Sequence, residues 1–314
     1  MRCDIDMCSE HGACSVNGSL CTCHEGFTGF NSFVYNEGIS CHTNTTLLVI
    51  LNVTSFVCVS LLWIYFIPGG YSNTRAIFVK YAKGLRISKL ERHFLIVIFI
   101  YCAVVIPSST TYYMISILDT DAKLGFSTPL SAAYLATLLG YFSALNLFQN
   151  SFLNSLVQAS NFKWTRFFAV LSILGFLLSV LSVMIPFAYS LLDTDLDNGN
   201  NYLVFQVHMI TFALGLLIPS LFSLIGIIQT RKIVFLAPAL ESDQGKQILT
   251  RIRKLEVETL LQGIAQAVLY LLFAFYPGAV LYFDAFIPVS WAAGTLVFFR
   301  IFKTFAENIR TPTQ

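Results

Sequence analysis

Seven long blocks of apolar residues fill most of this 314-residue chain, and they constrain its fold more than any other feature. Most of the blocks exceed the roughly 20 residues that a helix needs to cross a bilayer. In hydrocarbon each backbone amide must find its partner within the protein, so these blocks are expected to be helices. The predicted spans are about 45–67, 94–118, 129–158, 166–192, 202–228, 259–282 and 286–303.

The composition agrees with a membrane protein. Hydrophobic residues make up 56% of the chain and charged residues only 11%, against about 25% charge in ordinary soluble domains. We therefore expect an α-helical membrane protein, a seven-transmembrane bundle over 45–303 with a cytoplasmic tail at 304–314. Membrane lipids are the first expected partner, and no nucleic acid is expected.

The basic residues predict the orientation of the bundle. If the N-terminus lies outside and the chain crosses seven times, the 19 Lys and Arg residues all fall on the cytoplasmic side except Arg2 and Lys123. This bias is typical of the positive-inside rule. It predicts a multi-pass plasma-membrane protein with an extracellular N-terminus and a cytoplasmic C-terminus. No leader precedes Cys3, so either the first span translocates the N-terminal segment or, as we favour, a cleaved leader preceded this numbering.

Six of the eight cysteines precede the first span, at Cys3, Cys8, Cys14, Cys21, Cys23 and Cys41. So short a segment buries too little apolar surface to fold alone, and an even cysteine count in an oxidising compartment indicates a disulfide framework. Six cysteines allow fifteen pairings, and their spacing alone does not choose among them. Cys58 and Cys102 lie within predicted spans and are expected to be free thiols.

The spacing C-x4-C-x5-C-x6-C-x-C, with "HGAC" at 11–14 and "HEGFTGF" at 24–30, resembles an EGF-like module of the tenascin and teneurin style. The resemblance implies an extracellular module at 1–44, a small disulfide-rich ectodomain. It also implies first-to-third, second-to-fourth and fifth-to-sixth pairing, which here is Cys3–Cys14, Cys8–Cys21 and Cys23–Cys41. The last loop holds 17 residues, about twice the usual length. Either it contacts the bundle or a partner, or Cys41 is not the sixth cysteine.

Two glycosylation sequons lie on the predicted outer side, at Asn17 and Asn44. Asp4 and Asp6 lie between the first two cysteines, whereas the calcium-binding pattern of EGF-like modules places its acids before the first. We therefore interpret them as solvated aspartates and expect no metal and no cofactor.

Amide side chains form the main polar feature of the predicted bundle. Asn146, Asn150 and Asn154 recur every four residues and share one helix face. Ser143 continues this face, and the sixth span carries Gln262, Gln266 and Tyr270 at the same spacing. Such groups must face other helices or a watery cavity. Helix packing is favoured over a ligand pocket, with Gln266 the expected partner of Asn150. The segment "PSSTTYY" at 107–113 is polar enough to line an outer vestibule.

Three functions are compatible with the sequence. We favour a receptor-like or binding role in which the EGF-like module recognises an extracellular protein. The alternative is an adhesion protein or structural subunit of a membrane assembly. A transporter or intramembrane hydrolase is disfavoured, because no span centre carries a charge and His208 is the one histidine well inside a span.

The plan of seven helices resembles that of G-protein-coupled receptors in topology only, since the motifs of that family are missing from the third and seventh spans. No enzymatic activity and no catalytic residue are expected. The basic inner loops are candidates for a cytosolic partner, although simple anchoring at the inner membrane surface is the favoured interpretation.

Overall fold

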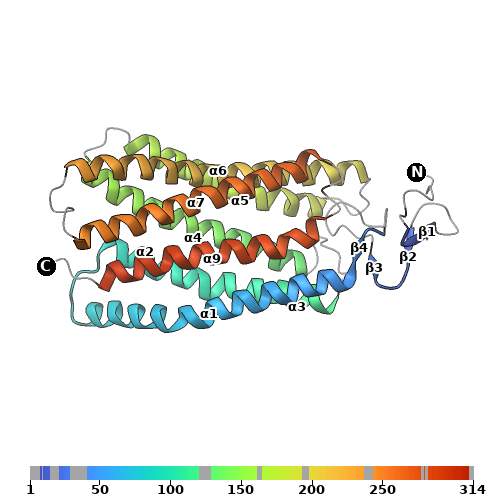
Figure 1. The fold of residues 1–314 in the computed structure, drawn as a ribbon, viewed down its shortest axis with the longest axis horizontal. Coiled ribbons are helices and arrows are strands. Elements are labelled where there is room, and N and C mark those ends of the chain that lie inside the picture. The colour runs from blue at the N-terminus through green and yellow to red at the C-terminus, as the bar shows by residue number, and fades with distance from the viewer. Residues whose placement is uncertain are drawn as a thin grey trace.

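A computed structural model describes residues 8, 10–14, 21–28, 41–119, 129–160, 165–192, 198–236, 243–276, 279 and 282–310. Figure 1 shows long helices lying side by side, with the N-terminal strands at one end and the C-terminal end of the last helix at the other. In the described residues, the helices follow the seven apolar blocks of the sequence. The helices are α1 (Thr45–Ala82), α2 (Lys89–Ile100), α3 (Ile106–Leu118), α4 (Pro129–Ser160), α5 (Thr165–Leu192), α6 (Asn198–Leu236), α7 (Asp243–Phe275) and α9 (Phe283–Arg310).

Two helical segments of the described chain are long and apolar enough to cross a membrane, Thr45–Ala82 and Glu91–Leu118. The second is made of α2 and α3, which a five-residue π-helical turn, η2 (Tyr101–Val105), joins into one rod. Shorter apolar stretches occur at Leu203–Ile218 and Leu260–Phe275.

Helix α1 extends well beyond the predicted end at residue 67. It runs through Pro68 to Ala82, because its continuation still has a face to bury: Gly70, Asn73 and Ile77 are all buried. Hydropathy marks where a helix leaves the apolar zone, whereas packing decides where it ends. The predicted first inner loop therefore shortens to the few residues between α1 and α2. In the same way α9 continues to Arg310, beyond the predicted last span at 303.

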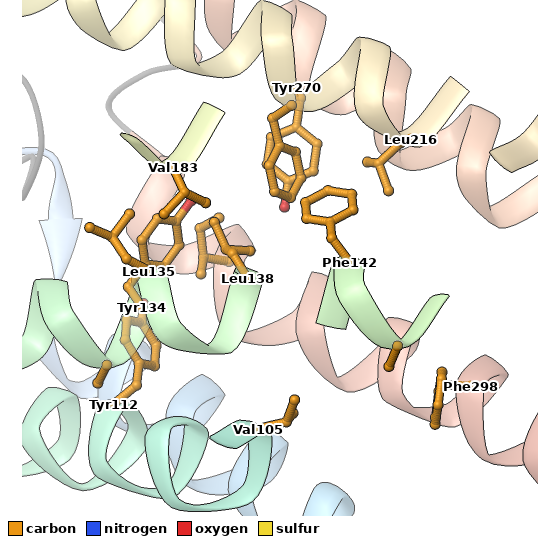
Figure 2. Close-up of a cluster of buried hydrophobic side chains, with 14 of the residues drawn as sticks. Val105, Tyr112, Tyr134, Leu135, Leu138, Phe142, Val183, Leu216, Tyr270 and Phe298 are labelled. Carbon is orange, nitrogen blue, oxygen red and sulfur yellow. The ribbon is translucent and has the colours of Figure 1, made fainter. Parts of the chain in front are cut away.

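The helices close into a ring. Going round it, α1 packs on α3, α3 on α4, α4 on α5, α5 on α6, α6 on α7, α7 on α9, and α9 back on α1. Helix α4 also reaches α6 and lies deepest, with Leu130, Tyr134, Leu138 and Phe142 almost fully buried. Figure 2 shows Phe142 on α4 and Tyr270 on α7 turned toward the same space between the helices.

The π-helical turn packs directly against α4. Pro107 lacks an amide hydrogen and disrupts the regular hydrogen bonds of the turn before it, which favours local rewinding. Gly140 on α4 faces this turn, and a Cβ at that position would lie 2.7 Å from Val105 Cγ2. A glycine is therefore required for the close approach of the two helices.

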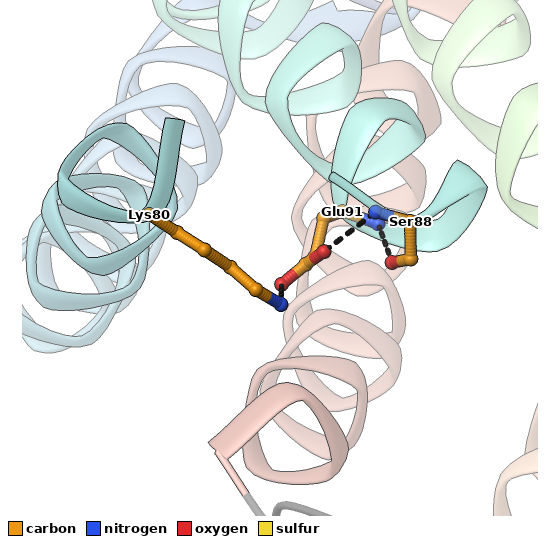
Figure 3. Close-up of polar contacts among 3 residues, drawn as sticks. All are labelled: Lys80, Ser88 and Glu91. Carbon is orange, nitrogen blue, oxygen red and sulfur yellow. Dashed lines mark hydrogen bonds and ion pairs between the residues drawn. The ribbon is translucent and has the colours of Figure 1, made fainter. Parts of the chain in front are cut away.

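The corner between α1 and α2 is built from local polar contacts (Figure 3). Ser88 caps α2: its hydroxyl accepts from the Glu91 amide at 3.2 Å, and the Glu91 carboxylate accepts from the Ser88 amide at 2.7 Å. Lys80 Nζ lies 2.9 Å from the same carboxylate. Gly84, with φ +70°, lets the chain leave α1 in a conformation that other residues avoid. This capping box and ion pair fix the sharp return of the chain.

Four short strands precede α1. Strand β1 (Gly12–Cys14) pairs antiparallel with β2 (Cys21–Cys23), and β3 (Phe27–Thr28) pairs antiparallel with β4 (Thr43–Asn44). The register sets Gly12 opposite Cys23 and Phe27 opposite Asn44. Strand β4 passes directly into α1, so the second ribbon is attached to the bundle without a linker.

Candidate functional site

An internal cavity of about 40 Å³ lies within the ring of helices. Its walls come from α1, η2, α3, α4, α6, α7 and α9, which makes it the place where most of the helices meet. The lining residues are Val59, Trp63, Val105, Ser109, Tyr113, Thr137, Leu138, Tyr141, Phe212, Leu216, Gln266, Tyr270, Ser290, Trp291, Gly294 and Thr295. None of these is ionised at neutral pH, so the site is aromatic and polar but uncharged.

Gln266 on α7 joins the cavity wall to α9. Its Nε2 donates to the carbonyl oxygen and to the hydroxyl of Ser290, both at 3.2 Å. The Tyr270 hydroxyl lies 3.5 Å from the same Ser290 hydroxyl. These bonds fix the orientation of the Gln266 amide, because only its nitrogen can donate to the carbonyl.

A second group of polar atoms surrounds Gly294 on α9. A Cβ at this glycine would lie 3.4 Å from Gln262 Nε2, 3.4 Å from Tyr141 Oη and 3.5 Å from Gln266 Nε2. Two amides from α7 and a hydroxyl from α4 therefore converge on the bare backbone of α9. A methyl group at this position would just touch all three atoms, so a side chain larger than alanine would displace them.

Aromatic rings close the cavity on its other sides. Trp291 stacks on Tyr134 with the ring centroids 5.4 Å apart, and it lies 4.7 Å from the Tyr112 ring. Phe212 lies against Tyr270 at 4.3 Å. Offset-stacked and edge-on arrangements are the ones that aromatic pairs prefer, and each adds about 0.5–1.5 kcal/mol to the packing. The shape of the cavity is therefore set by rigid groups.

The α3 helix is tied to its neighbours at the same level. The hydroxyls of Ser108 and Thr137 share a hydrogen bond of 2.8 Å between α3 and α4. Tyr113 donates to the carbonyl oxygen of Pro288 on α9 at 3.3 Å. Ser109 and Tyr113, from the segment expected to line a vestibule, do line the cavity.

His208 lies near the cavity but is not part of its lining. It is fully buried, with Nδ1 against the carbonyl oxygen of Ser182 and Nε2 3.4 Å from the Tyr134 hydroxyl. A carbonyl only accepts, so Nδ1 carries the proton and Nε2 accepts from Tyr134. Both ring nitrogens are thus engaged in links from α6 to α5 and α4, which is a packing role.

The predicted amide face is described in part. Asn146, Asn150 and Asn154 lie in α4 as expected, but their side chains are outside the described residues. Ser143 donates to the carbonyl of Leu139 in its own helix at 2.7 Å. The described hydrogen bonds of Gln266 go to Ser290 on α9, whereas the sequence suggested Asn150 on α4 as its partner. The reason is that α9 packs against α7 and places Ser290 within hydrogen-bonding distance of Gln266.

The predicted disulfide residues are also partly described. Cys8 is bonded to Cys21 and Cys23 to Cys41, which are the second-to-fourth and fifth-to-sixth connections. Cys14 is disulfide-bonded as well, and its expected partner Cys3 lies outside the described residues. Cys58 and Cys102 are free thiols.

Of the two sequons, Asn17 lies outside the described residues. Asn44 is exposed and caps α1, with its Oδ1 accepting from the Leu47 amide at 3.2 Å. Glycan attachment uses the amide nitrogen, so the cap and the sequon engage different atoms of the same side chain.

Several cavity residues could not have been selected from the sequence. Ser290, Trp291 and Gly294 belong to the shortest predicted span and show no polar periodicity. Tyr141 looks like an ordinary residue of an apolar helix. The sequence pattern did indicate Tyr270, because it follows Gln262 and Gln266 at intervals of four residues on one helix face.

Among the described residues, no three His, Cys, Asp or Glu side chains are grouped as a metal ion would require. Comparison with known proteins gives no relative: no family model matches the chain, and neither a curated protein nor a solved structure is found to be similar. The functional argument therefore rests on the geometry of this chain.

Proposed function

We propose that the chain is a seven-span plasma-membrane protein with a receptor-like binding role, whose EGF-like N-terminal module recognises an extracellular protein. The observation that carries the proposal is the exposure of large apolar side chains around the ring of helices. Large apolar side chains point outward around the ring, while the mainly apolar cavity inside it carries a few hydroxyl and amide groups. The exposed apolar residues include Ile64 on α1, Phe99 on α2, Val170 on α5, Leu203 on α6, Leu261 on α7 and Phe286 on α9.

A soluble protein rarely exposes so much apolar surface, because each patch costs free energy in water. In a bilayer the same side chains are in their preferred environment. That six of the helices carry such residues supports immersion of the whole ring, beyond the two segments that meet the length and hydropathy criteria for a span.

The charge distribution supports the orientation. Exposed basic residues of the α1–α2 corner and of α9 lie at the end of the bundle opposite the strands (Figure 1). They include Lys83, Arg86, Arg92, Arg300 and Lys303. By the positive-inside rule this end is cytoplasmic, and the disulfide-bonded strands are then extracellular.

The attachment of the strands supports a receptor-like role. The Thr45 amide at the start of α1 donates to the carbonyl of Gly26 at 3.0 Å, so the turn before β3 is bonded directly to the first turn of the helix. His42 also meets the ring of Tyr282, just before α9, with the centroids 5.7 Å apart. A partner bound to the module would therefore act on both α1 and α9, two helices that line the cavity.

The experiment uses fluorescent vesicles carrying the full chain with its N-terminus outward, incubated with cells of the source organism. We expect saturable adhesion that protease treatment of the cells abolishes. It should also be absent from vesicles carrying the Cys23→Ser/Cys41→Ser variant. Vesicles that aggregate with one another but do not bind the cells would favour the adhesion alternative. Absence of both aggregation and cell binding would contradict the proposal.

The orientation has its own test. A protease-sensitive tag near Gly245, in the first turn of α7, should be protected in intact cells and cleaved after permeabilisation. A glycan on Asn17 should be accessible to glycosidase from outside. Cleavage of the tag in intact cells would overturn the orientation and the receptor-like role together.

A further inference from the structure

We infer that the internal cavity binds a compact aliphatic alcohol, or the hydroxyl end of a lipid, through the hydroxyl of Tyr141 and the side-chain oxygen of Gln266. The inference goes beyond the extracellular recognition proposed above and does not depend on it. Its basis is a group of polar side chains that line the cavity and keep accessible surface there, Tyr141, Gln266 and Thr295.

Gln266 contributes an acceptor to the cavity. It lies on the side of α7 opposite the exposed residues Leu261 and Val268, so its accessible surface belongs to the interior of the ring. Its Nε2 is committed to Ser290, which leaves Oε1 as the open end of the amide. An amide oxygen can only accept, so the partner that it lacks in the described part of the chain must be a donor.

Tyr141 contributes a hydroxyl from α4. This side chain is half-buried although α4 lies deepest in the ring, so its open surface faces the cavity. Its hydroxyl makes no hydrogen bond within the described residues and, unlike the hydroxyl of Tyr101, is not fully enclosed. Tyr141 and Gln266 meet at Gly294, where a Cβ would lie 3.4 Å from Tyr141 Oη and 3.5 Å from Gln266 Nε2. One small bound group can therefore reach both side chains.

This combination selects an alcohol. The oxygen of an alcohol can donate its proton to Gln266 Oε1 and accept from the Tyr141 hydroxyl at the same time. A ketone or ether oxygen only accepts, so it would leave the Gln266 oxygen without a donor, which is costly in a buried site. Thr295, half-buried on α9, adds a hydroxyl that can donate or accept as the bound group requires.

The walls favour an alcohol over an ion or water. None of the cavity residues carries a charge, and an ion moved there from water would lose its hydration without gaining a counter-charge. A water could use the same polar groups, but the apolar walls, Val59, Leu138 and Leu216 among them, offer it no further partner. These walls suit the carbon atoms of an alcohol instead.

The size of the cavity limits what enters it. One water needs roughly 10–15 Å³ of such space, so a cavity of about 40 Å³ accepts a few water-sized groups. A molecule of the size of 2-propanol is therefore a suitable probe. A larger alcohol, such as diacylglycerol, would place only its hydroxyl end in the cavity.

The experiment compares 2-propanol with acetone, which has the same carbon frame but no donor, and with isobutane, which has a methyl group in place of the hydroxyl. Binding to the full chain in phosphatidylcholine nanodiscs is measured by ligand-observed NMR. We expect 2-propanol to bind about tenfold more tightly than acetone, because acetone leaves the Gln266 oxygen without a donor. Tyr141→Phe should weaken the binding of 2-propanol about five- to tenfold and change that of isobutane by less than about twofold.

Tyr101→Phe is the matched control. It removes a tyrosine hydroxyl that is fully enclosed and belongs to a residue outside the cavity lining, so it should leave all three affinities unchanged. Thr295→Val serves if Tyr141→Phe fails to fold, because it removes another hydroxyl of the same cavity at nearly constant volume. It should weaken 2-propanol more than isobutane.

Equal affinities for 2-propanol and acetone would overturn the inference. An equal loss of 2-propanol and isobutane binding in Tyr141→Phe would overturn it as well, since it would show that the hydroxyl only maintains the shape of the cavity. Absence of saturable 2-propanol binding, with water alone in the cavity, would have the same consequence.

Nanodiscs that also contain diacylglycerol distinguish the two sources of the hydroxyl. Competition that raises the apparent Kd of 2-propanol would identify the hydroxyl end of a lipid as the occupant, and an unchanged Kd would identify a free alcohol. Vesicle adhesion depends on the disulfide-bonded module, which Tyr141→Phe leaves untouched. Failure of the cavity inference would therefore leave the proposed extracellular recognition intact, and the reverse also holds.

Discussion

The N-terminal strands and the helical bundle are stabilised in different ways. In the described part of the strand region, the buried apolar residues are Cys8 and Cys41, so its small interior consists largely of the disulfides themselves. The bundle has an extensive core of aromatic and aliphatic side chains, including Tyr134, Phe142 and Phe205, none of which is exposed. One region depends on covalent cross-links and the other on packing, and each should therefore fail under a different perturbation.

The largest expected effect is the loss of a disulfide in the strand region. Cys23→Ser/Cys41→Ser should destabilise this region by about 2–5 kcal/mol, enough to unfold so small a unit. Hydrogen exchange at 21–28 and 41–44 should become fast, while the core of α4 stays protected. The thermal midpoint of the bundle should fall by less than about 2 °C, because a few contacts at α1 and Tyr282 join the two regions. If the bundle unfolded together with the strands, the two regions would not be stabilised independently.

The second prediction perturbs packing in the bundle instead. Gly263 on α7 faces α6, and a Cβ there would overlap the hydroxyl of Ser220, which is itself buried. Gly263→Ala should therefore displace the Ser220 hydroxyl from its hydrogen bond to the Leu216 carbonyl and crowd the Ser220 Cβ, 3.2 Å away, at a cost of about 1–3 kcal/mol measured by unfolding in detergent. The disulfide-bonded strands should keep their exchange protection.

The control for this variant is Gly69→Ala in α1. No atom lies within 4 Å of the added methyl group, and alanine is the better helix former by about 1 kcal/mol. The two Gly-to-Ala changes should therefore have opposite signs. If both variants were equally destabilising, close approach of α6 and α7 would not explain the effect at Gly263.

The same contrast explains what could be predicted from the sequence. The positions of the helices followed from hydropathy, since long apolar blocks have few other stable forms in a membrane. Their ends did not: α1 continues past Pro68 because Asn73 and Ile77 are buried, and burial depends on which neighbour is present. The cavity was likewise invisible. It depends on Ser290 and Gly294 of α9 lying opposite Gln266 of α7, a relation between helices that no local pattern encodes.

In the strand region the cysteine spacing carried more information. The resemblance to EGF-like modules implied Cys8–Cys21 and Cys23–Cys41, and both bonds are present. Covalent frameworks leave a regular spacing in the sequence, because each loop must have a length that allows closure. A region stabilised by packing, such as the bundle, leaves in the sequence only a preference for apolar residues at many positions.

A third, smaller effect is expected at the corner between α1 and α2. The Ser88 hydroxyl caps α2 by accepting from the Glu91 amide, and removal of such a cap costs about 1 kcal/mol. Ser88→Ala should lower the unfolding midpoint of the bundle, and Ser88→Thr, which keeps the hydroxyl, should restore most of it. An unchanged midpoint in Ser88→Ala would mean that this corner frays before the bundle unfolds.

The smallest effect is expected from the charge at the same corner. Glu91→Gln keeps an oxygen that can accept from the Ser88 amide but removes the ion pair with Lys80, whose side chain is 42% exposed. Because water screens so exposed a partner, the loss should be only a few tenths of a kcal/mol. It should become smaller in about 1 M salt, where the Debye length is roughly 3 Å.

Arg300→Gln offers a matched comparison at the other exposed pair, between α9 and Glu258 on α7. There the side-chain exposures are 53% and 22%, against 42% and 9% at the α1–α2 corner. Its effect should therefore be smaller still, and unfolding curves of both variants at low and high salt measure the two differences. A salt-independent loss above about 1 kcal/mol in Glu91→Gln would show that the capping oxygen, and not the charge, was disturbed. The stability of the bundle would then depend on its corners as well as on its core.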